Sequence, residues 1–294
     1  MRDPYKETVW LAQKAAVPTF QRLFRRLINV HSIVLVDLNT LPSYLSEWMF
    51  KSKSLECITF KGLNEGKFPK DFWSQSNPSL QVSVQYEPPG DRQVHFLDEA
   101  PITRLQTSWS HLFALMQSSN GPSFDRLTAL SITTNEHKSV LEVLWMLRYF
   151  PTLQKLHLSG EIAHQHLNGS KGLLEELTEM AKAALPFLQE ITTASHDFLT
   201  TLLLDKRPLR RVEYQEIPKD LNEFIFSLLR MAHSTIETLG FHCAPGEFEP
   251  LEKIRLFKSL RSLYVTLVTH SWSVSEPTYG VKYTNINKKP NHDR

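Results

Sequence analysis

Cysteine and glycine are scarce in this sequence, and their scarcity excludes several classes of protein. Only two cysteines occur among 294 residues, Cys57 and Cys243. Their separation matches neither a disulfide framework nor the paired spacing of a zinc site. Glycine is limited to ten residues, and no phosphate-binding glycine loop, G-x-S-x-G elbow or H-E-x-x-H motif is found. The sequence therefore predicts no cofactor, no metal ion and no enzyme of a familiar kind.

Long apolar runs and an excess of charge are also missing. No stretch approaches about eighteen uninterrupted apolar residues, and the N-terminal residues lack the apolar centre of a signal peptide. The 33 basic and 31 acidic residues give a net charge of +2, which is too small for a dedicated nucleic-acid binder. We therefore expect an intracellular protein of the cytoplasm or nucleus, with neither a membrane nor a nucleic acid as its partner.

What the sequence does contain is a loose repeat. A six-residue pattern places apolar residues at its first, fourth and sixth positions, and Leu153, Leu156 and Leu158 show it best. Copies start at 127, 153, 188, 209, 236 and 260, which is mostly the spacing of leucine-rich repeats. The other copies are Leu55/Ile58/Phe60, Leu127/Leu130/Ile132, Leu209/Val212/Tyr214, Ile236/Leu239/Phe241, Leu260/Leu263/Val265 and the weaker Leu188/Ile191/Thr193.

Several segments between these copies have the period of a helix. Residues 139–149, 172–184 and 220–232 each place apolar side chains on one face, and Pro151 and Pro186 follow the first two before the next copy. A strand and its helix cannot bury both apolar faces alone, so such units must stack. The pattern predicts an α/β leucine-rich-repeat solenoid, horseshoe-like, with a parallel sheet on its concave face and helices on its convex face.

The chain divides into three regions on this basis. Residues 1–29 are expected to form capping helices, since Phe20, Leu23, Phe24, Leu27 and Ile28 make an apolar stripe; a membrane-surface helix is the alternative. Residues 30–270 are the irregular repeat domain, whose part 62–107 is a degenerate repeat with a loop and at most one strand. Residues 271–294 are polar and are expected to be a disordered tail.

The candidate binding residues alternate with the buried positions of the strands. They are expected to line the concave face, where a mixture of Arg, Tyr, His and carboxylate groups suits a protein ligand. These residues are Lys155, His157, Glu190, Thr192, Arg211, Glu213, Thr238, Arg261 and Tyr264, with Thr59 and Ser131 as further members of the same face.

The repeat region resembles that of fungal F-box proteins, which are substrate receptors of cullin-type ubiquitin ligases. The resemblance rests on residues 150–158 (FPTLQKLHL), on 185–188 (LPFL) leading to 198–203, and on 207–212 (RPLRRV). It implies a non-catalytic receptor for a protein substrate, with a cullin-ligase adaptor as a further partner. No F-box segment is recognisable: residues 41–49 are predicted to be a helix of the first repeat, because a strand follows at Leu55.

Other functions remain open at this point. A repeat scaffold unconnected to ubiquitin ligases is one alternative, and a hydrolase with an unrecognised His/carboxylate site is another. His164 and His166 have a spacing found in metal sites, but no further ligands are evident nearby. His242 and Cys243 point to opposite faces of their expected strand, so they cannot act together. Lys206, Arg207, Arg210 and Arg211 form a basic cluster, which lacks the aromatic residues that stack on nucleic-acid bases.

Overall fold

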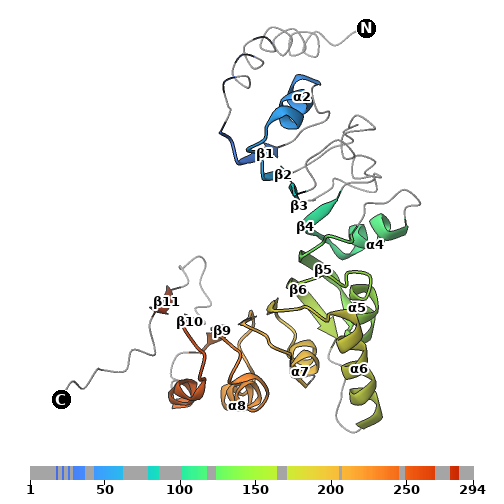
Figure 1. Ribbon diagram of the computed structural model, residues 1–294. Coiled ribbons are helices and arrows are strands. Elements are labelled where there is room, and N and C mark those ends of the chain that lie inside the picture. The colour runs from blue at the N-terminus through green and yellow to red at the C-terminus, as the bar shows by residue number, and fades with distance from the viewer. Residues whose placement is uncertain are drawn as a thin grey trace, which may run out of the picture. The chain divides into compact units, whose positions relative to one another are not determined.

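The computed structural model (Figure 1) folds into two compact units. Unit 1 comprises residues 1–107 and 111–123, and unit 2 comprises 108–110 and 124–294. The structure describes residues 29–36, 43–61, 79–85, 101–117, 124–163, 171–204, 207–244, 249–268 and 279–284, with single positions 18, 22 and 26. Most of the expected N-terminal helical region and of the segment 62–107 lies outside the described residues, and so do both His164 and His166.

Unit 1 contains four strands that follow the order of the sequence. They are β1 (Ser32–Val36), β2 (Cys57–Lys61), β3 (Gln81–Gln85) and β4 (Ile102–Ser108), and neighbouring strands are parallel. Helix α2 (Ser43–Lys51) connects the first two strands, as the pattern of residues 41–49 predicts, and α4 (Trp109–Gln117) follows β4 in the chain. Every second side chain of β2 and β3 is fully buried, namely Ile58, Phe60, Val82 and Val84.

Strand β4 corrects one prediction, because the sequence indicates at most one strand within 62–107 and the structure has two. Thr103 and Thr107 occupy buried positions of β4, so the apolar alternation is hidden in the sequence. The hydroxyl of Thr103 donates to the carbonyl of Val82 at 3.0 Å, which satisfies the buried polar group. Thr103 also stands at a register shift between the two strands, and such an extra residue disturbs the period further.

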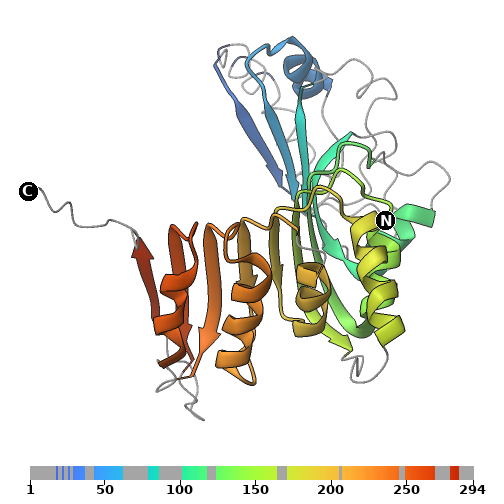
Figure 2. The ribbon, with the colours of Figure 1, turned by 60° about the horizontal axis from the view of Figure 1, so that its bottom comes forward.

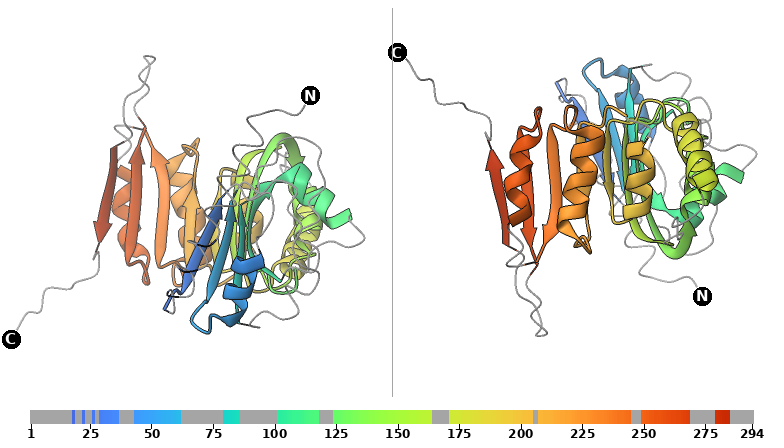
Figure 3. Two further views of the ribbon diagram at one scale, coloured as in Figure 1. Left: turned by 90° about the horizontal axis from the view of Figure 1, so that it is seen from above. Right: turned by 90° about the horizontal axis from the view of Figure 1, so that it is seen from below.

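Unit 2 alternates strands and helices, which confirms the expected α/β class. The strands β5 (Ala129–Ser139) to β10 (Ser262–Leu267) are parallel and ordered as in the sequence, and the helices cover one face of the sheet (Figure 2). In Figure 3 the strands lie in front of the helices in one view and behind them in the other. The remaining elements are α5 (Val140–Leu147), β6 (Lys155–Ala163), α6 (Lys171–Ala184), β7 (Glu190–Thr193), α7 (His196–Leu204), β8 (Arg211–Tyr214), α8 (Leu221–Ala232), β9 (Thr238–Cys243) and the 3-10 helix η2 (Glu249–Leu256).

Two of these helices begin at polar residues that cap them. Ser139 accepts a hydrogen bond from the N–H of Glu142, and the Glu142 carboxylate accepts one from the N–H of Ser139. Asp220 accepts from the N–H of Glu223 at 3.0 Å. Both side chains satisfy N–H groups that the first turn of a helix leaves without a partner. The expected starts of these two helices near 139 and 220 are therefore confirmed.

The apolar residues of the strands form one ladder across unit 2. The fourth position of the six-residue pattern is occupied by Leu130, Leu156, Ile191, Val212, Leu239 and Leu263, which are direct neighbours in the register. All six are buried against the helices. The predicted alignment of the strands is therefore confirmed, including the weak copy at Ile191, where the buried Thr193 accepts a hydrogen bond from the N–H of Ser195.

A backbone arrangement recurs just before the strands. Two successive N–H groups donate to one carbonyl of the preceding repeat, as Gln154 and Lys155 do to Thr128 at 2.9 Å each. This shared acceptor fixes the start of each strand relative to its neighbour. Among the described residues the other donors and acceptors are Glu56 and Cys57 to His31, Gln189 and Glu190 to Gln154, Arg210 and Arg211 to Gln189, Glu237 and Thr238 to Arg210, and Arg261 and Ser262 to Glu237.

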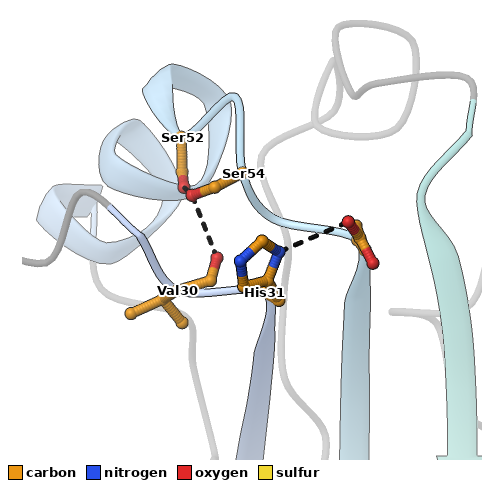
Figure 4. Close-up of polar contacts among 5 residues, drawn as sticks. Val30, His31, Ser52 and Ser54 are labelled. Atoms are coloured by element: carbon orange, nitrogen blue, oxygen red, sulfur yellow. Dashed lines mark hydrogen bonds and ion pairs between the residues drawn. The ribbon is translucent and has the colours of Figure 1, made fainter.

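A side-chain hydroxyl supports the same turn in both units. In unit 1 the hydroxyl of Ser54 donates to the carbonyl of Val30 at 3.2 Å, beside the pair of His31 and Glu56 (Figure 4). In unit 2 the hydroxyl of Thr152 donates to the carbonyl of Leu127 at 2.9 Å. Both hydroxyls precede the first apolar residue of a copy, so they hold that residue at the start of its strand.

One glycine is required by a close approach of two strands. Gly160 in β6 has a φ of 103°, which side chains with a Cβ rarely adopt. A Cβ at this position would lie 1.9 Å from the carbonyl oxygen of Thr134 in β5. The register of β5 and β6 shifts directly after this contact, between Thr134 and Lys138. The absence of a Cβ at Gly160 therefore allows this register shift, after which β5 and β6 pair again.

The C-terminal region differs from its prediction. Residues 279–284 form β11 (Tyr279–Thr284), which pairs with β10 and is antiparallel to it. The expectation of a disordered tail over 271–294 therefore does not hold for this segment. The physical reason is that the outer edge of β10 offers unpaired backbone groups, with which the backbone of residues 279–284 pairs.

We expect the substitution Leu239→Ala to lower the free energy of unfolding by about 2–5 kcal/mol, because it leaves a cavity in the middle of the ladder. Leu239 is fully buried, whereas the adjacent Thr238 lies on the other face of β9. Thr238→Ala serves as the control and should cost less than about 1 kcal/mol. Urea unfolding followed by circular dichroism measures both, and equal losses would contradict the ladder.

Candidate functional site

The face of the sheet opposite the helices carries the predicted binding residues of unit 2 in two rows. The first row consists of Lys155, Glu190, Arg211 and Thr238, each of which is the register partner of the next. Thr238 pairs in turn with Ser262, so Ser262 completes the row. The alternation of the strands, which buries Leu156 and Val212, points these side chains away from the helices.

The second row lies two residues further along each strand. It consists of Ser131, His157, Thr192, Glu213, Gly240 and Tyr264, again as direct register partners. His157, Thr192, Glu213 and Tyr264 are partly exposed. The structure therefore brings together eight of the nine predicted residues. Thr59 belongs to β2 in unit 1, where it is partly exposed.

Arg261 is the exception among the predicted residues. It precedes β10, and its N–H and that of Ser262 donate to the same carbonyl of Glu237. The prediction counted Arg261 as an outward strand position, but Arg261 lies two residues before the buried Leu263, and the residues that alternate with Leu263 are Ser262 and Tyr264. Ser262 therefore takes the place in the first row that was assigned to Arg261, whose side chain is exposed outside the strand.

Opposite charges alternate within and between the two rows. The ammonium of Lys155 lies 2.6 Å from the Glu190 carboxylate, and Arg211 pairs with Glu213. The hydroxyl of Thr192 donates to the other carboxylate oxygen of Glu213 at 3.1 Å. These side chains are one third to one half exposed, so each pair adds less than about 1 kcal/mol to stability. Their main effect is to hold the charged groups in fixed positions.

The surroundings shift the pKa values of two groups in these rows. The hydrogen bond to Glu213 raises the pKa of Arg211, and the nearby Glu190 acts in the same direction. Partial burial lowers the pKa of His157, although the Glu213 carboxylate offsets part of this effect. At neutral pH His157 is therefore an uncharged hydrogen-bonding group next to a network of fixed charges.

Gly240 is a member of the site that the sequence analysis missed. It stands in the second row between Glu213 and Tyr264, and a Cβ there would lie 3.0 Å from Cγ of Glu213 and 3.7 Å from Cβ of Tyr264. The space that a side chain of Gly240 would need is therefore already bordered by the side chains of Glu213 and Tyr264. The available signal was a glycine at an outward position of an otherwise regular strand.

The basic cluster at 207–211 does not form one positive surface. Arg207 is 6% exposed, and its guanidinium donates to the carbonyls of Ala181 and Leu185 at the end of α6. Such a cation stabilises the C-terminus of a helix. Arg210 lies 4.0 Å from Glu237, and Arg211 pairs with Glu213. These three arginines therefore serve different contacts, and Lys206 lies outside the described residues.

The remaining candidate chemistry is limited in the described part of the chain. Cys243 is fully buried and its thiol donates to the carbonyl of Ala244 at 3.1 Å, whereas the neighbouring His242 is partly exposed. The described residues contain no group of three or more His, Cys, Asp or Glu residues placed to hold a metal ion. None of the helices among the described residues is long and apolar enough to cross a membrane.

Comparison with known proteins adds no family assignment. No model of a known protein family matches the sequence, and no curated protein shows significant similarity to it.

The lowered pKa of His157 predicts a pH-dependent contribution to stability. The unfolded chain takes up this proton more readily, so stability should fall as the pH drops below about 6.5 toward the folded-state pKa. His157→Gln removes this contribution. Urea unfolding at pH 7.5 and 5.5 should show a smaller loss of stability in the variant than in the original protein, and an equal loss would contradict the assignment.

Proposed function

We propose that the protein is a leucine-rich-repeat solenoid that binds another protein through the two rows of side chains on the sheet face of unit 2. The observation that carries this proposal is the register, which sets Lys155, Glu190, Arg211, Glu213 and Tyr264 side by side on the face that the helices leave uncovered. Arg and Tyr are frequent anchors of protein interfaces. Side chains held by regular strands also lose little freedom on binding.

The charge pattern supports a protein ligand of mixed polarity. Each cation of the rows lies beside a carboxylate, so the face has no excess of one charge. A partner with a complementary order of charges can join these pairs, whereas a mismatched one would leave a charge without its counterpart. Tyr264 adds an aromatic side chain at one end of the second row. We therefore propose that the partner is recognised by the order of its charged groups, which pair with those of the two rows, and by an apolar group that contacts Tyr264.

The assignment to leucine-rich repeats rests on three features. The six-residue pattern recurs with a spacing near that of the family, a helix or a 3-10 helix separates most strands of unit 2, and the shared carbonyl acceptor returns before the strands. We also propose a role as the substrate receptor of a cullin-type ligase, for which the support is the resemblance of residues 150–212 to fungal F-box proteins. The proposed role is non-catalytic.

The partner surface is tested by the double substitution Arg211→Ala and Tyr264→Ala. Proximity labelling in the native organism, followed by mass spectrometry, should lose the specific partner at least about tenfold relative to the unchanged protein. The matched control is Arg230→Ala with Phe187→Ala, which likewise removes an arginine and an aromatic side chain, both exposed and outside the rows. An unchanged set of labelled proteins in the first variant would refute the proposed surface.

The ligase role is tested by purifying the tagged chain and measuring cullin adaptor and cullin subunits in the eluate. We expect both to be recovered, and to be recovered equally with the Arg211→Ala/Tyr264→Ala variant, because a substrate and an adaptor need separate surfaces. Recovery of a specific partner without any adaptor would instead support a scaffold unconnected to ubiquitin ligases. That result would end the ligase proposal and leave the binding surface intact.

A further inference from the structure

Helix α5 is apolar on two faces, only one of which is used by the core. Val140, Val143, Leu144 and Leu147 are fully buried. On the outer side Leu141, Trp145 and Tyr149 follow one another at intervals of four residues and are 36%, 44% and 46% exposed. A helix that is apolar all round is normally covered on all sides. We call Leu141, Trp145, Arg148 and Tyr149 the α5 ridge.

The ridge has a fixed arrangement of rings and charge. The rings of Trp145 and Tyr149 meet edge to face with centroids 5.5 Å apart. The guanidinium of Arg148 lies 5.5 Å from the centroid of Trp145 and 5.6 Å from that of Tyr149. Among the residues that the structure describes, Arg148 has no carboxylate partner. The ridge therefore presents a positive charge, held by two aromatic rings, at the end of an apolar stripe.

The opposite end of the ridge is different in charge. Glu142 lies in the first turn of α5, where the backbone and hydroxyl of Ser139 hold its carboxylate. Hydrogen bonding from the Ser139 backbone lowers the pKa of Glu142, so the group stays negative at neutral pH. A ligand along the ridge therefore meets a negative group near Leu141 and a positive group near Tyr149.

The exposed ring of Phe226 in unit 2 also has a cation over it, but that cation has a hydrogen-bond partner. Lys253 covers the ring of Phe226 at 4.1 Å, but its ammonium also donates to the side-chain carbonyl of Asn222 at 2.6 Å. The cation at Phe226 is thus bound within the protein, whereas the charge of Arg148 faces outward over the rings. This contrast distinguishes the ridge from the exposed ring of Phe226.

We propose that the α5 ridge binds a short acidic segment of a protein partner, in which a carboxylate lies next to a large aliphatic or aromatic side chain. The carboxylate pairs with the guanidinium of Arg148, and the neighbouring apolar group covers Trp145 and Leu141. Trp, Tyr and Arg are the residues that contribute most often to the affinity of interfaces. The positive charge of Arg148 is complementary to an acidic ligand, and the rows on the sheet face take no part in this contact.

The test is selection of a phage-displayed library of random twelve-residue peptides on the full-length protein. Recovered peptides should be enriched in Asp or Glu beside Leu, Ile or Trp. Their affinity, measured with synthetic copies by fluorescence polarisation, should fall at least about tenfold with Trp145→Ala and with Arg148→Ala. Both side chains are exposed, so the variants should unfold at the same urea concentration as the original protein.

Two further variants test whether the charge of Arg148 sets the peptide preference and whether binding is confined to the ridge. Arg148→Glu should reverse the preference of the selection from acidic to basic peptides, and Phe226→Ala should leave the affinity unchanged. Enrichment of basic or uncharged peptides on the original protein would overturn the proposal, as would binding that survives Trp145→Ala. Light scattering that shows a dimer broken by Trp145→Ala would also overturn it, since a second copy would then be the occupant.

Discussion

The strands of this protein depend on one recurring interaction, in which a backbone carbonyl accepts two successive N–H groups from the following repeat. The interaction involves only main-chain atoms, so it does not depend on which side chains occupy the start of the strand. It helps to fix the register of β2 and of β6 to β10, each against the strand before it. Because the register is fixed, apolar residues of different repeats fall into one ladder and polar residues into rows. Core and candidate site therefore have the same origin.

The sequence is a good guide where burial selects one chemical type. The ladder from Leu130 to Leu263 was predictable, because each position must be apolar to pack against the helices. Helices α5, α6 and α8 were predictable for the same reason, with Ser139 and Asp220 adding caps. The outward positions followed from the alternation of strand residues, so most of the candidate rows could be named without coordinates.

Features that depend on pairing between distant residues were not predictable. Thr103 is buried because it reaches the carbonyl of Val82, and nothing near it in the sequence indicates that contact. Arg207 was assigned to a basic cluster, although its guanidinium binds the end of α6. Arg261 is a different case, because it was assigned to the outward face although it precedes β10 and lies two residues before the buried Leu263. For Thr103 and Arg207, hydrogen bonds to carbonyl groups distant in the sequence explain the buried position.

The two surfaces of unit 2 differ in how their charges are arranged. On the sheet face Lys155 and Arg211 lie beside carboxylates of the same protein, so a ligand must exchange or extend existing pairs. Such an arrangement of charges contributes more to the specificity of binding than to its affinity. On the helix side, the guanidinium of Arg148 lies over two aromatic rings and has no carboxylate partner among the described residues, so the proposed ligand would pair with it directly. The two surfaces proposed for unit 2 therefore differ in that the first has paired charges and the second has a cation with no described carboxylate partner.

The reversed direction of β11 has a consequence for how this fold could have grown. Arrays of this kind lengthen by duplication, and each new copy adds a parallel strand to the last one. Here the place beyond β10 is taken by a strand that runs the other way. Because β11 pairs along β10, a further parallel strand cannot pair with β10 in the present arrangement, so this edge of β10 is closed to another repeat.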